Sequence, residues 1–499
     1  MKNIFLIFLI CIAVSSQAGI IVKGSGSGII SVTSMAGINS GDTILIKPGT
    51  YTGAIFKNLS DVTIMNGNGL VTFTGTVDFG GNYNGSSGGK SMINVTFTGR
   101  GSSSYLYGFL FTSAQTAVVG TAARNSGIHF YRCFFQGVGL CFDFSANTGS
   151  VTYDGTIAST KLSNSSFSYC RADNCFQFMQ GAYSGITSLI NIFDSVEWAY
   201  DTLNNTVANA NGFFGNYVAA DCLHFSIHNN YIHYTGLCSI QHDVGAFLIS
   251  GSGMFYKNFL YGGRGYMLRC FGASSLSAPE DTWIFDNIKL ATTKYGLADI
   301  RSDSSEYGTG NHFTGTNFHV IYNTAGNLKD LEPENPFVVP IAVIYQLSGS
   351  AKAEVRNNLL FNAAPTNGLT DAIFSDFSGS GRVESSHNMY FASSSVMTEL
   401  ADTDKLCEPR DGSLLIASGK SLTSVTTDYN GRTRPDPPAI GAQENANGSQ
   451  KRIVKTSIIQ PFKKIGHRKL LLLTAGILFL SISFFAVTKF AKNKKSISS

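Results

Sequence analysis

Short runs of alternating apolar and polar residues, separated by Gly-rich turns or by a corner asparagine, fill most of this chain. Residues 353–361, AEVRNNLLF, show the unit: an alternating run, an Asn pair and a second short apolar run. A period of two predicts β-strands with one buried face. The same pattern recurs at residues 128–135, 161–169, 191–198, 225–232, 254–260, 283–290, 318–324 and 383–391.

The spacing of this unit predicts a repeat architecture. Its corner position recurs every 28–36 residues, which is the range of solenoid repeats. No segment between the strands has the 3.6-residue period of an amphipathic helix, which excludes leucine-rich and other α/β solenoids. We expect the corner at Cys133, Ser166, Ser195, Asn230, Asn258, Asn287, Asn323, Asn358 and Asn388.

These features predict an all-β fold in which coils of three short strands stack in parallel. In such a stack, a corner Asn can donate a hydrogen bond to one neighbouring coil and accept one from the other, so that the amides form a ladder. Each coil buries its inward side chains only against its neighbours. The expected ladder consists of Asn230, Asn258, Asn287, Asn323, Asn358 and Asn388.

Three features carry a resemblance to known proteins: residues 47–53 (KPGTYTG), the corner asparagines, and residues 428–444 (DYNGRTRPDPPAIGAQE). On these features, residues 20–444 resemble the right-handed parallel β-helix proteins of the pectin-lyase-like superfamily. The resemblance implies a right-handed parallel β-helix domain over residues 19–444. It also implies that polysaccharide lies along the first sheet of the coils.

The two ends of the chain carry targeting signals. Residues 1–18 contain Lys2, an apolar run and a small-residue cleavage site, which is typical of a secretory signal peptide. Residues 470–488 are nineteen apolar or small residues without a charge, long enough to span a ~30 Å hydrocarbon core as a helix. We expect a single-pass membrane protein with an exported domain, a linker at 445–469, and a short basic cytoplasmic tail at 489–499.

The charge balance argues against nucleic acid as a partner. The chain has 36 basic and 32 acidic residues, but eleven basic residues lie in 451–499 and one is Lys2. The exported part therefore has 24 basic residues against 32 acidic ones, and its net charge is −8. The basic end of the chain is explained by contact with anionic lipid headgroups.

The exported part of the chain has an even number of cysteines, because removal of the signal peptide with Cys11 leaves eight of the nine. An even number permits all of them to form disulfides in an exported chain. Cys141 and Cys175 follow their corner positions at similar distances, so we expect them to begin equivalent strands in neighbouring coils, where they could form a disulfide. The alternative is that both are small buried apolar residues.

The outward positions of the first sheet hold the candidate chemistry. Acids beside arginines suit β-elimination of a uronide, because Ca²⁺ or Arg neutralises the substrate carboxylate and a base then removes the adjacent proton. Arg269, Arg301 and His242 are the catalytic candidates. Asp243 and Asp299 are the candidate Ca²⁺ ligands. The expected outward column contains Asp143, Gln177, Asp201, His242 or Asp243, Arg269, Asp299, Arg301 and Asp376.

Two interpretations of function stay open. One is an exported, membrane-anchored protein that binds extracellular or envelope polysaccharide and, if it is an enzyme, cleaves it as a lyase. The other is a non-catalytic surface or adhesion rod, since any soluble rod exposes scattered charges. The activity motifs of the superfamily are incomplete: residues 263–269 (GRGYMLR) keep two arginines of the pectate-lyase RxPxxR run without its proline, and YDTL at 200–203 resembles QDTL of pectin esterases.

Overall fold

The structure is a computed structural model, and the chain forms two compact units, residues 1–452 and 453–499. All described residues lie in the first unit. The predicted membrane helix and cytoplasmic tail, and the signal peptide apart from Ala18, fall outside them. Within the described part, no helix is long and apolar enough to cross a membrane. The described residues are 18–80, 92–102, 104–120, 124–145, 151–182, 190–205, 217–234, 245–263, 265–272, 280–291, 296–301, 316–328, 341–347, 350–363, 373–376, 378, 380–391, 398–403 and 405–446.

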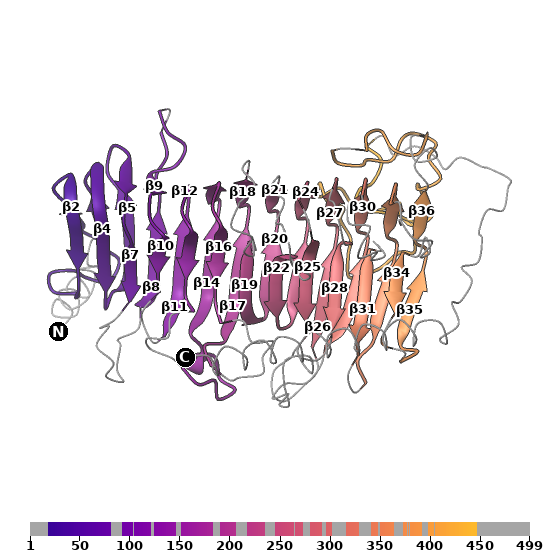
Figure 1. The fold of residues 1–499 in the computed structure, drawn as a ribbon, viewed down its shortest axis with the longest axis horizontal. Coiled ribbons are helices and arrows are strands. Elements are labelled where there is room, and N and C mark those ends of the chain that lie inside the picture. The colour runs from indigo at the N-terminus through magenta and orange to yellow at the C-terminus, as the bar shows by residue number, and fades with distance from the viewer. Residues whose placement is uncertain are drawn as a thin grey trace, which may run out of the picture. The chain divides into compact units, whose positions relative to one another are not determined.

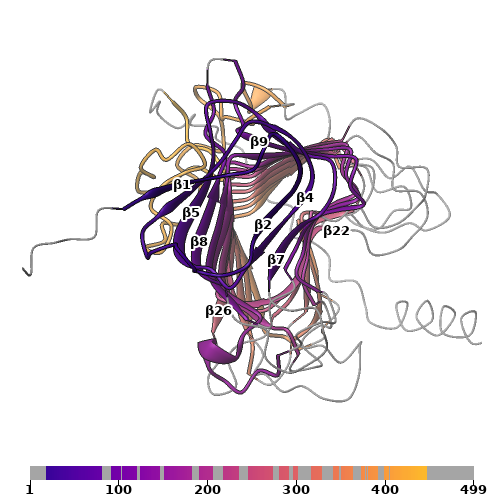
Figure 2. The same ribbon diagram turned by 90° about the vertical axis from the view of Figure 1, so that its left-hand side faces the viewer.

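Three-stranded coils stack in parallel to form a β-helix, as the repeat predicts. From β5 onward almost every strand pairs in parallel with the strand three places later in the chain, so the coils carry three parallel sheets, here called faces 1, 2 and 3 (Figures 1 and 2). A single 3₁₀ turn, η1 (Ile157–Ser159), interrupts the described strands.

Face 1 contains β7 (Val77–Gly80), β10 (Thr116–Val119), β13 (Leu140–Asp143), β16 (Gln177–Gln180), β19 (Val218–Leu223), β22 (Gly245–Ser250), β25 (Tyr266–Phe271), β28 (Ala298–Arg301), β31 (Ala342–Gln346) and β34 (Phe374–Asp376). Face 2 contains β1 (Ile20–Lys23), β3 (Thr43–Ile46), β5 (Ser60–Asn66), β8 (Met92–Thr98), β11 (Asn125–Tyr131), β14 (Leu162–Ser168), β17 (Phe193–Ala199), β20 (Phe225–His228), β23 (Gly253–Tyr256), β26 (Asp281–Phe285), β29 (Asn317–Ile321), β32 (Ala353–Arg356) and β35 (Val383–Ser386). Face 3 contains β6 (Val71–Phe73), β9 (Phe109–Thr112), β12 (Cys133–Gln136), β15 (Arg171–Asp173), β18 (Thr202–Asn205), β21 (Tyr231–Tyr234), β24 (Phe259–Tyr261), β27 (Ile288–Leu290), β30 (Thr324–Gly326), β33 (Leu359–Phe361) and β36 (Met389–Phe391). The first coils are completed by β2 (Ser27–Val32) and β4 (Gly49–Lys57), and β4 pairs with both β6 and β7.

The interior is filled by the inward residues of the alternating strands. In the early coils these are mainly phenylalanines, which stack along the coil axis: the ring centroids of Phe97 and Phe130 lie 5.4 Å apart, and those of Phe111 and Phe135 lie 4.7 Å apart. All four are fully buried. Because each ring contacts the coil before and the coil after it, the core is continuous along the stack.

From β11 onward, a short bend joins face 2 to face 3 in each coil. Its first residue has a left-handed backbone, as at Tyr169 (φ 54°) and Tyr200 (φ 59°), and its second is the corner residue. The predicted corners at Ser166 and Ser195 are therefore wrong, because both serines lie inside seven-residue strands, β14 and β17. The bend comes later, so that the corner residues of these two coils are Cys170 and Asp201.

The six predicted asparagines form one continuous ladder. The side-chain amide of Asn258 donates to the Ile227 carbonyl at 2.9 Å and to Oδ1 of Asn287 at 3.1 Å. The backbone N–H of Asn258 also donates to Asn287 Oδ1, at 3.0 Å. The same three hydrogen bonds recur from Asn230 to Asn358, and the amide of the last rung, Asn388, again donates to a carbonyl of the preceding coil. The ladder therefore satisfies buried backbone groups at the corner of each of these coils.

Residues 398–446 return along the coils after the last strand and cover the outward side of face 3. Leu400, Leu415 and Ile440 of this closing segment form one apolar cluster with Phe259 of β24 and Leu359 of β33, among other residues. Figure 2 shows the segment, in gold, beside the stack. The late coils of face 3 thus have a second apolar layer on their outer side.

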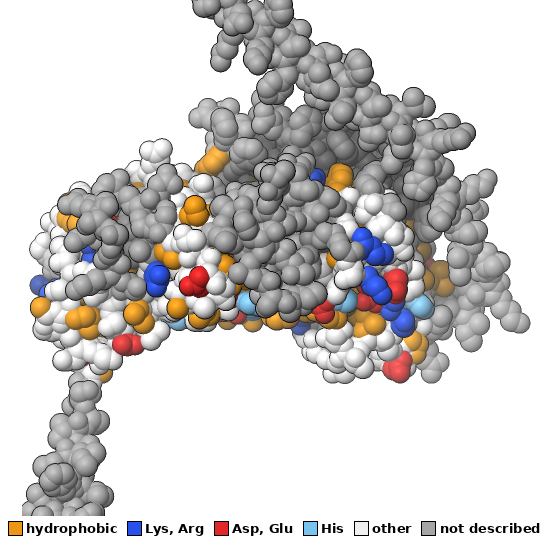
Figure 3. Space-filling view, turned by 90° about the horizontal axis from the view of Figure 1, so that it is seen from below, with side chains coloured by type: hydrophobic (Ala, Val, Ile, Leu, Met, Phe, Trp, Pro, Cys, Tyr) orange, Lys and Arg blue, Asp and Glu red, His pale blue; other side chains and the backbone are white. Residues whose placement is uncertain are grey.

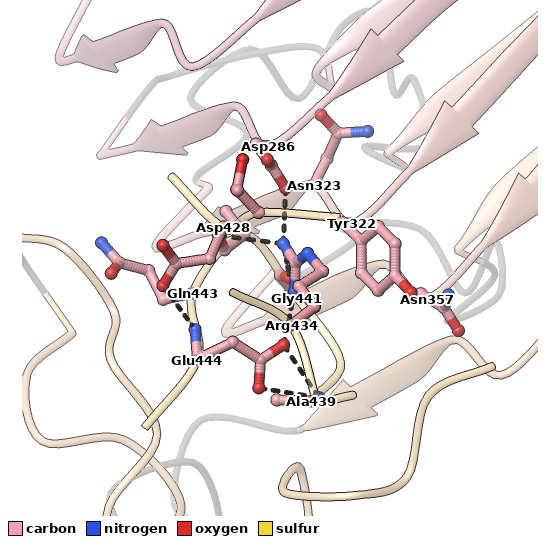
Figure 4. A network of polar contacts seen from close by, with 12 residues as sticks. Asp286, Tyr322, Asn323, Asn357, Asp428, Arg434, Ala439, Gly441, Gln443 and Glu444 are labelled. Carbon is pink, nitrogen blue, oxygen red and sulfur yellow. Dashed lines mark hydrogen bonds and ion pairs between the residues drawn. The ribbon is translucent and has the colours of Figure 1, made fainter. Parts of the chain in front are cut away.

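A buried arginine fixes this closing segment to the coils. Arg434 Nη2 lies 2.5 Å from Asp286 Oδ1, at the bend after β26, and Nη1 lies 2.7 Å from Glu444 Oε1. The guanidinium also sits over the Tyr322 ring, 3.8 Å from its centroid (Figure 4). All of these side chains are buried, so the polar network is shielded from water.

Candidate functional site

Face 1 brings together three of the residues expected from the sequence. Leu248, Arg269, Asp299 and Val343 are register partners on β22, β25, β28 and β31, so they form one outward column. Arg301 lies two residues beyond Asp299 on β28, which places it on the same side of the sheet. Arg269, Asp299 and Arg301 are therefore neighbours, and we call them the Arg–Asp–Arg cluster.

Asp143 belongs to the same register column, which runs from Asp143 through Gln180, Ala219 and Leu248 to Arg269. Gln177 does not, because it is the register partner of Leu140. Asp201 is not on face 1 at all, since it occupies the corner between faces 2 and 3. His242 and Asp243 lie outside the described residues. Their predicted roles stay predictions.

The Arg–Asp–Arg cluster is a compact, shielded ionic group. Arg269 Nε lies 3.1 Å from Asp299 Oδ2, and both side chains are 2% exposed. Arg301 Nε lies 3.6 Å from Asp299 Oδ1, and its side chain is 11% exposed. One carboxylate is thus shared by two guanidinium groups on adjacent strands.

Aromatic rings surround the two guanidinium groups. Arg301 lies 4.4 Å from the ring centroid of Tyr345 on β31 and 5.5 Å from that of Phe271 on β25, while Arg269 lies 5.4 Å from the same Phe271 centroid. Burial raises the pKa of Tyr345, and the nearby Asp299 carboxylate raises it further. Its phenol is therefore protonated at neutral pH and can donate a hydrogen bond.

Asp299 does not fit a Ca²⁺ site. Ca²⁺ takes six to eight oxygen ligands, but both oxygens of this carboxylate face arginine side chains. The part of the chain that the structure describes contains no group of three or more His, Cys, Asp or Glu side chains arranged to hold a metal ion. The two arginines are thus the electrophilic groups that the described residues place around Asp299.

A second constellation, which the sequence did not reveal, lies where face 1 turns into face 2. His224 Nδ1 lies 2.7 Å from Asp194 Oδ1, and Nε2 lies 3.1 Å from Glu280 Oε1. Ser252 Oγ donates to the other oxygen of Glu280. The hydrogen bond to Asp194, with that to Glu280, raises the pKa of His224 to about 9. The imidazolium is therefore held between two carboxylates from different coils.

The neighbouring histidines are engaged in the same way. His228 Nε2 lies 2.9 Å from Glu197 Oε1, and His233 Nδ1 lies 3.1 Å from Asn204 Oδ1. Both contacts join adjacent coils. The histidine-rich segment thus connects coils instead of collecting around a ligand.

Charged residues also gather on face 2 of the last coils. His319 Nδ1 lies 2.9 Å from Glu354, and Arg356 lies 2.8 Å from Glu354 and 2.7 Å from Glu384. Figure 3 shows acidic, basic and histidine side chains together at the right-hand, C-terminal end of the described surface. These charges pair with one another across consecutive coils, which is the usual behaviour of a solvated sheet face.

The two expected cysteines are close together but free. Cys141 and Cys175 are buried thiols, so the predicted disulfide is not formed in this structure. Burial raises the pKa of Cys141 well above its ordinary value, and a hydrogen bond with Cys175 raises it further. The thiols therefore face each other inside the stack.

Comparison with known proteins finds that this chain is similar to solved structures of polysaccharide lyases. The chain is similar to the pectate lyase Pel9A at 13% identity and a TM-score of 0.32, over 84% of this chain and 97% of that one. It is similar to the PL6-family alginate lyase AlyGC at 11% identity and a TM-score of 0.33, over 88% of this chain and 60% of the alginate lyase. A mutant of AlyGC gives 11% identity and a TM-score of 0.35, over 87% of this chain and 60% of the mutant.

No protein-family model matches the chain, and no curated protein matches it. At such low identities and TM-scores, the likeness to lyases decides nothing about the chemistry of this protein. The fold rests on the strand pairing of this chain, and any function has to rest on its own side chains.

Proposed function

We propose that this protein is an exported, membrane-anchored β-helix that binds acidic polysaccharide along face 1 through the Arg–Asp–Arg cluster. The observation that carries the proposal is that Arg269 and Arg301 share the single carboxylate of Asp299. Guanidinium groups recognise carboxylates through paired hydrogen bonds. A uronate carboxylate offers these guanidinium groups the same chemistry as the Asp299 carboxylate.

Cleavage by β-elimination is the reaction that this chemistry favours. Neutralising a uronate carboxylate acidifies the proton on the adjacent carbon. A base removes that proton, a double bond forms, and the bond to the leaving glycosidic oxygen breaks. Tyr345, whose phenol is protonated, can return a proton to that oxygen. His242, a catalytic candidate from the sequence, serves as the base in this proposal.

A product assay tests this proposal. The protein is incubated with alginate, pectate and glycosaminoglycans, and unsaturated product is followed by its ultraviolet absorbance. We expect product on at least one polymer, and a loss of ~10²-fold or more on Arg301→Ala. Arg356→Ala is the matched control, because Arg356 is ion-paired on face 2. The absence of product on all polymers, with and without Ca²⁺, contradicts the lyase proposal.

Burial favours a second candidate, a non-catalytic surface or adhesion rod. Arg269 and Asp299 are each only 2% exposed, so the cluster can serve as an internal ionic link between coils. In that case the protein gives no product, and Arg301→Ala lowers its thermal stability without changing retention on immobilised uronate polymers. A lyase or a binding protein loses retention with the same substitution.

The location of the protein is part of the proposal. The apolar run at 470–488 and the signal-peptide pattern at 1–18 support export followed by anchoring. Protease added to intact cells should remove the β-helix domain and leave the C-terminal tail protected. Deleting 470–499 should release the domain from the membrane fraction. If the full chain is recovered in the soluble fraction of the cells, the anchoring proposal fails.

A further inference from the structure

Two cysteines occupy the ladder corner in the coils where the asparagines stop. Going toward the N-terminus from Asn230, the corner residues are Asp201, Cys170 and Cys133. Cys170 and Cys133 follow left-handed residues, Tyr169 and Arg132, just as the ladder asparagines do. They therefore stand in the position from which an Asn amide would reach the next coil.

The backbone holds these cysteines as direct neighbours. Phe134 and Arg171 are register partners in β12 and β15, and each immediately follows one of the cysteines. Adjacent parallel strands lie ~4.8 Å apart, which falls within the Cα separation of ~4.4–6.8 Å seen in disulfides. Both side chains are buried, at 0% and 1% exposure. Burial raises the pKa of Cys170 well above its ordinary value, and a hydrogen bond with Cys133 raises it further, so the thiols face each other.

Cys133 and Cys170 are both free thiols in this structure, as Cys141 and Cys175 are. We propose that in the oxidised protein Cys133 and Cys170 form a disulfide that joins these two coils at the corner where the amide ladder is absent. The proposal rests on the proposed export of the chain, because disulfides persist in oxidising compartments. Each thiol loses a proton and one electron, the S–S bond forms, and a disulfide oxidant such as glutathione disulfide is reduced to two thiols.

Register distinguishes this pair from Cys222 and Cys270. Cys222 is the register partner of Phe193, and Cys270 is that of Ile249 and Ile300, so neither has a cysteine beside it in those pairings. Cys141 and Cys175, the pair expected from the sequence, lie in the same two coils as Cys133 and Cys170. Thiol pairs are thus concentrated at one place in the described part of the stack, and that place adjoins the end of the ladder.

The burial of the pair sets when the bond can form. The reacting species is a thiolate, and the buried Cys170 thiol, whose pKa is raised, supplies almost none. We therefore expect oxidation during folding, before the two coils close. The folded, reduced chain should resist oxidation.

Peptide mapping tests the proposal on the full chain. The protein is purified in detergent without reductant, denatured with N-ethylmaleimide, and digested with trypsin. Cleavage after Arg132, Lys161 and Arg171 leaves Cys170 as the single cysteine of peptide 162–171, and places Cys133 with Cys141 in peptide 133–161. We expect these two peptides to be linked, and expect the link to survive in the Cys141→Ser and Cys222→Ser variants but not in Cys133→Ser.

Refolding separates this inference from the question of export. Denatured, reduced chain is refolded with a mixture of glutathione and glutathione disulfide and mapped in the same way. If the two peptides are linked in the refolded protein but carry free thiols in protein purified from cells, the result supports the Cys133–Cys170 disulfide and counts against export. Recovery of peptide 162–171 with maleimide on Cys170 from both preparations overturns the proposal. Dithiothreitol should also lower the melting temperature of the oxidised protein by a few degrees and should have less effect on Cys170→Ser.

Discussion

Arg434 and Asp286 are separated by 148 positions in the chain and form a buried ion pair, with 2.5 Å between Nη2 and Oδ1. Their side chains are 3% and 0% exposed. Burial raises the pKa of Asp286 to about 7, although Arg434 opposes the shift. The carboxylate thus depends on the arginine to remain charged. This pair, with Glu444, holds the closing segment against the coils.

Replacing Arg434 should be strongly destabilising. Arg434→Met leaves Asp286 and Glu444 buried without their cation, and removing one partner of a buried pair costs about 3–5 kcal/mol. Chemical denaturation measures the loss. Arg171→Met is the matched control, because Arg171 is 37% exposed and pairs with Asp173 on its own strand; we expect a loss below about 1 kcal/mol there. Equal losses in the two variants would show that the buried pair has no special role.

The position of a rung along the ladder should decide its contribution to stability. Asn287 is fully buried, and its amide bonds both adjacent coils. Asn287→Ala leaves several buried groups without partners, at about 1–3 kcal/mol each. Asn388 is partly exposed at the last rung, so Asn388→Ala should cost about 1 kcal/mol. Thermal unfolding of both variants makes the comparison, and a larger loss at Asn388 would contradict the ladder model.

The fold was predictable because its stabilising contacts repeat. Alternation along β32 sets its inward face, and an Asn at the bend recurs in six successive coils, so these coils repeat the same signal. The predicted corner positions Ser166 and Ser195 were wrong for a local reason. β14 and β17 run further than the alternating pattern suggests, and the Asn that would have marked the bend is replaced by Cys170 and Asp201.

The candidate site was predictable only where strands stay in register. Arg269 and Asp299 were expected together, and β25 and β28 place them as partners. Gln177 was assigned to the outward column, but Gln180 occupies that position on β16. The sequence does not reveal the length of the turn before β16, so it does not fix which residue of the strand faces outward. Contacts such as Arg434 to Asp286 come from a segment that crosses the repeat, and no periodic pattern announces them.

His224 should titrate far above an ordinary histidine. Its hydrogen bond to Asp194, supported by Glu280, raises its pKa to about 9. A raised histidine pKa stabilises the fold fully below the unfolded value of ~6.5 and loses that effect as pH rises through the folded value. NMR titration of the ring should therefore give a midpoint near pH 9.

The same linkage predicts how stability changes in a variant. His224→Gln should lower the melting temperature at pH 6, and the difference from the unmodified protein should shrink as the pH rises through 9. His233→Gln is the control, because His233 contacts the amide of Asn204 instead of a carboxylate. A difference that stays constant with pH would show that the charge of His224 contributes nothing.

Asp201 is an acid in a position built for an amide. Asn230 Oδ1 accepts from the Asp201 N–H at 3.0 Å, and Asp201 Oδ1 accepts from the Cys170 N–H at 2.7 Å, as in the ladder. Burial raises the pKa of Asp201 well above its ordinary value, although the hydrogen bond from Cys170 opposes the shift. A protonated carboxyl can donate a hydrogen bond as an amide does, whereas a carboxylate cannot.

Asp201→Asn should therefore stabilise the protein at pH 8 and have little effect at pH 4. An acid whose pKa is raised in the fold contributes stability below its unfolded value of ~3.9 and loses it as pH rises through the folded value. Each unit of that shift corresponds to about 1.4 kcal/mol. Asn230→Asp is the reciprocal control and should destabilise more at pH 8 than at pH 4. If Asp201→Asn is destabilising at pH 8, the carboxylate is charged and Asp201 is not part of the ladder.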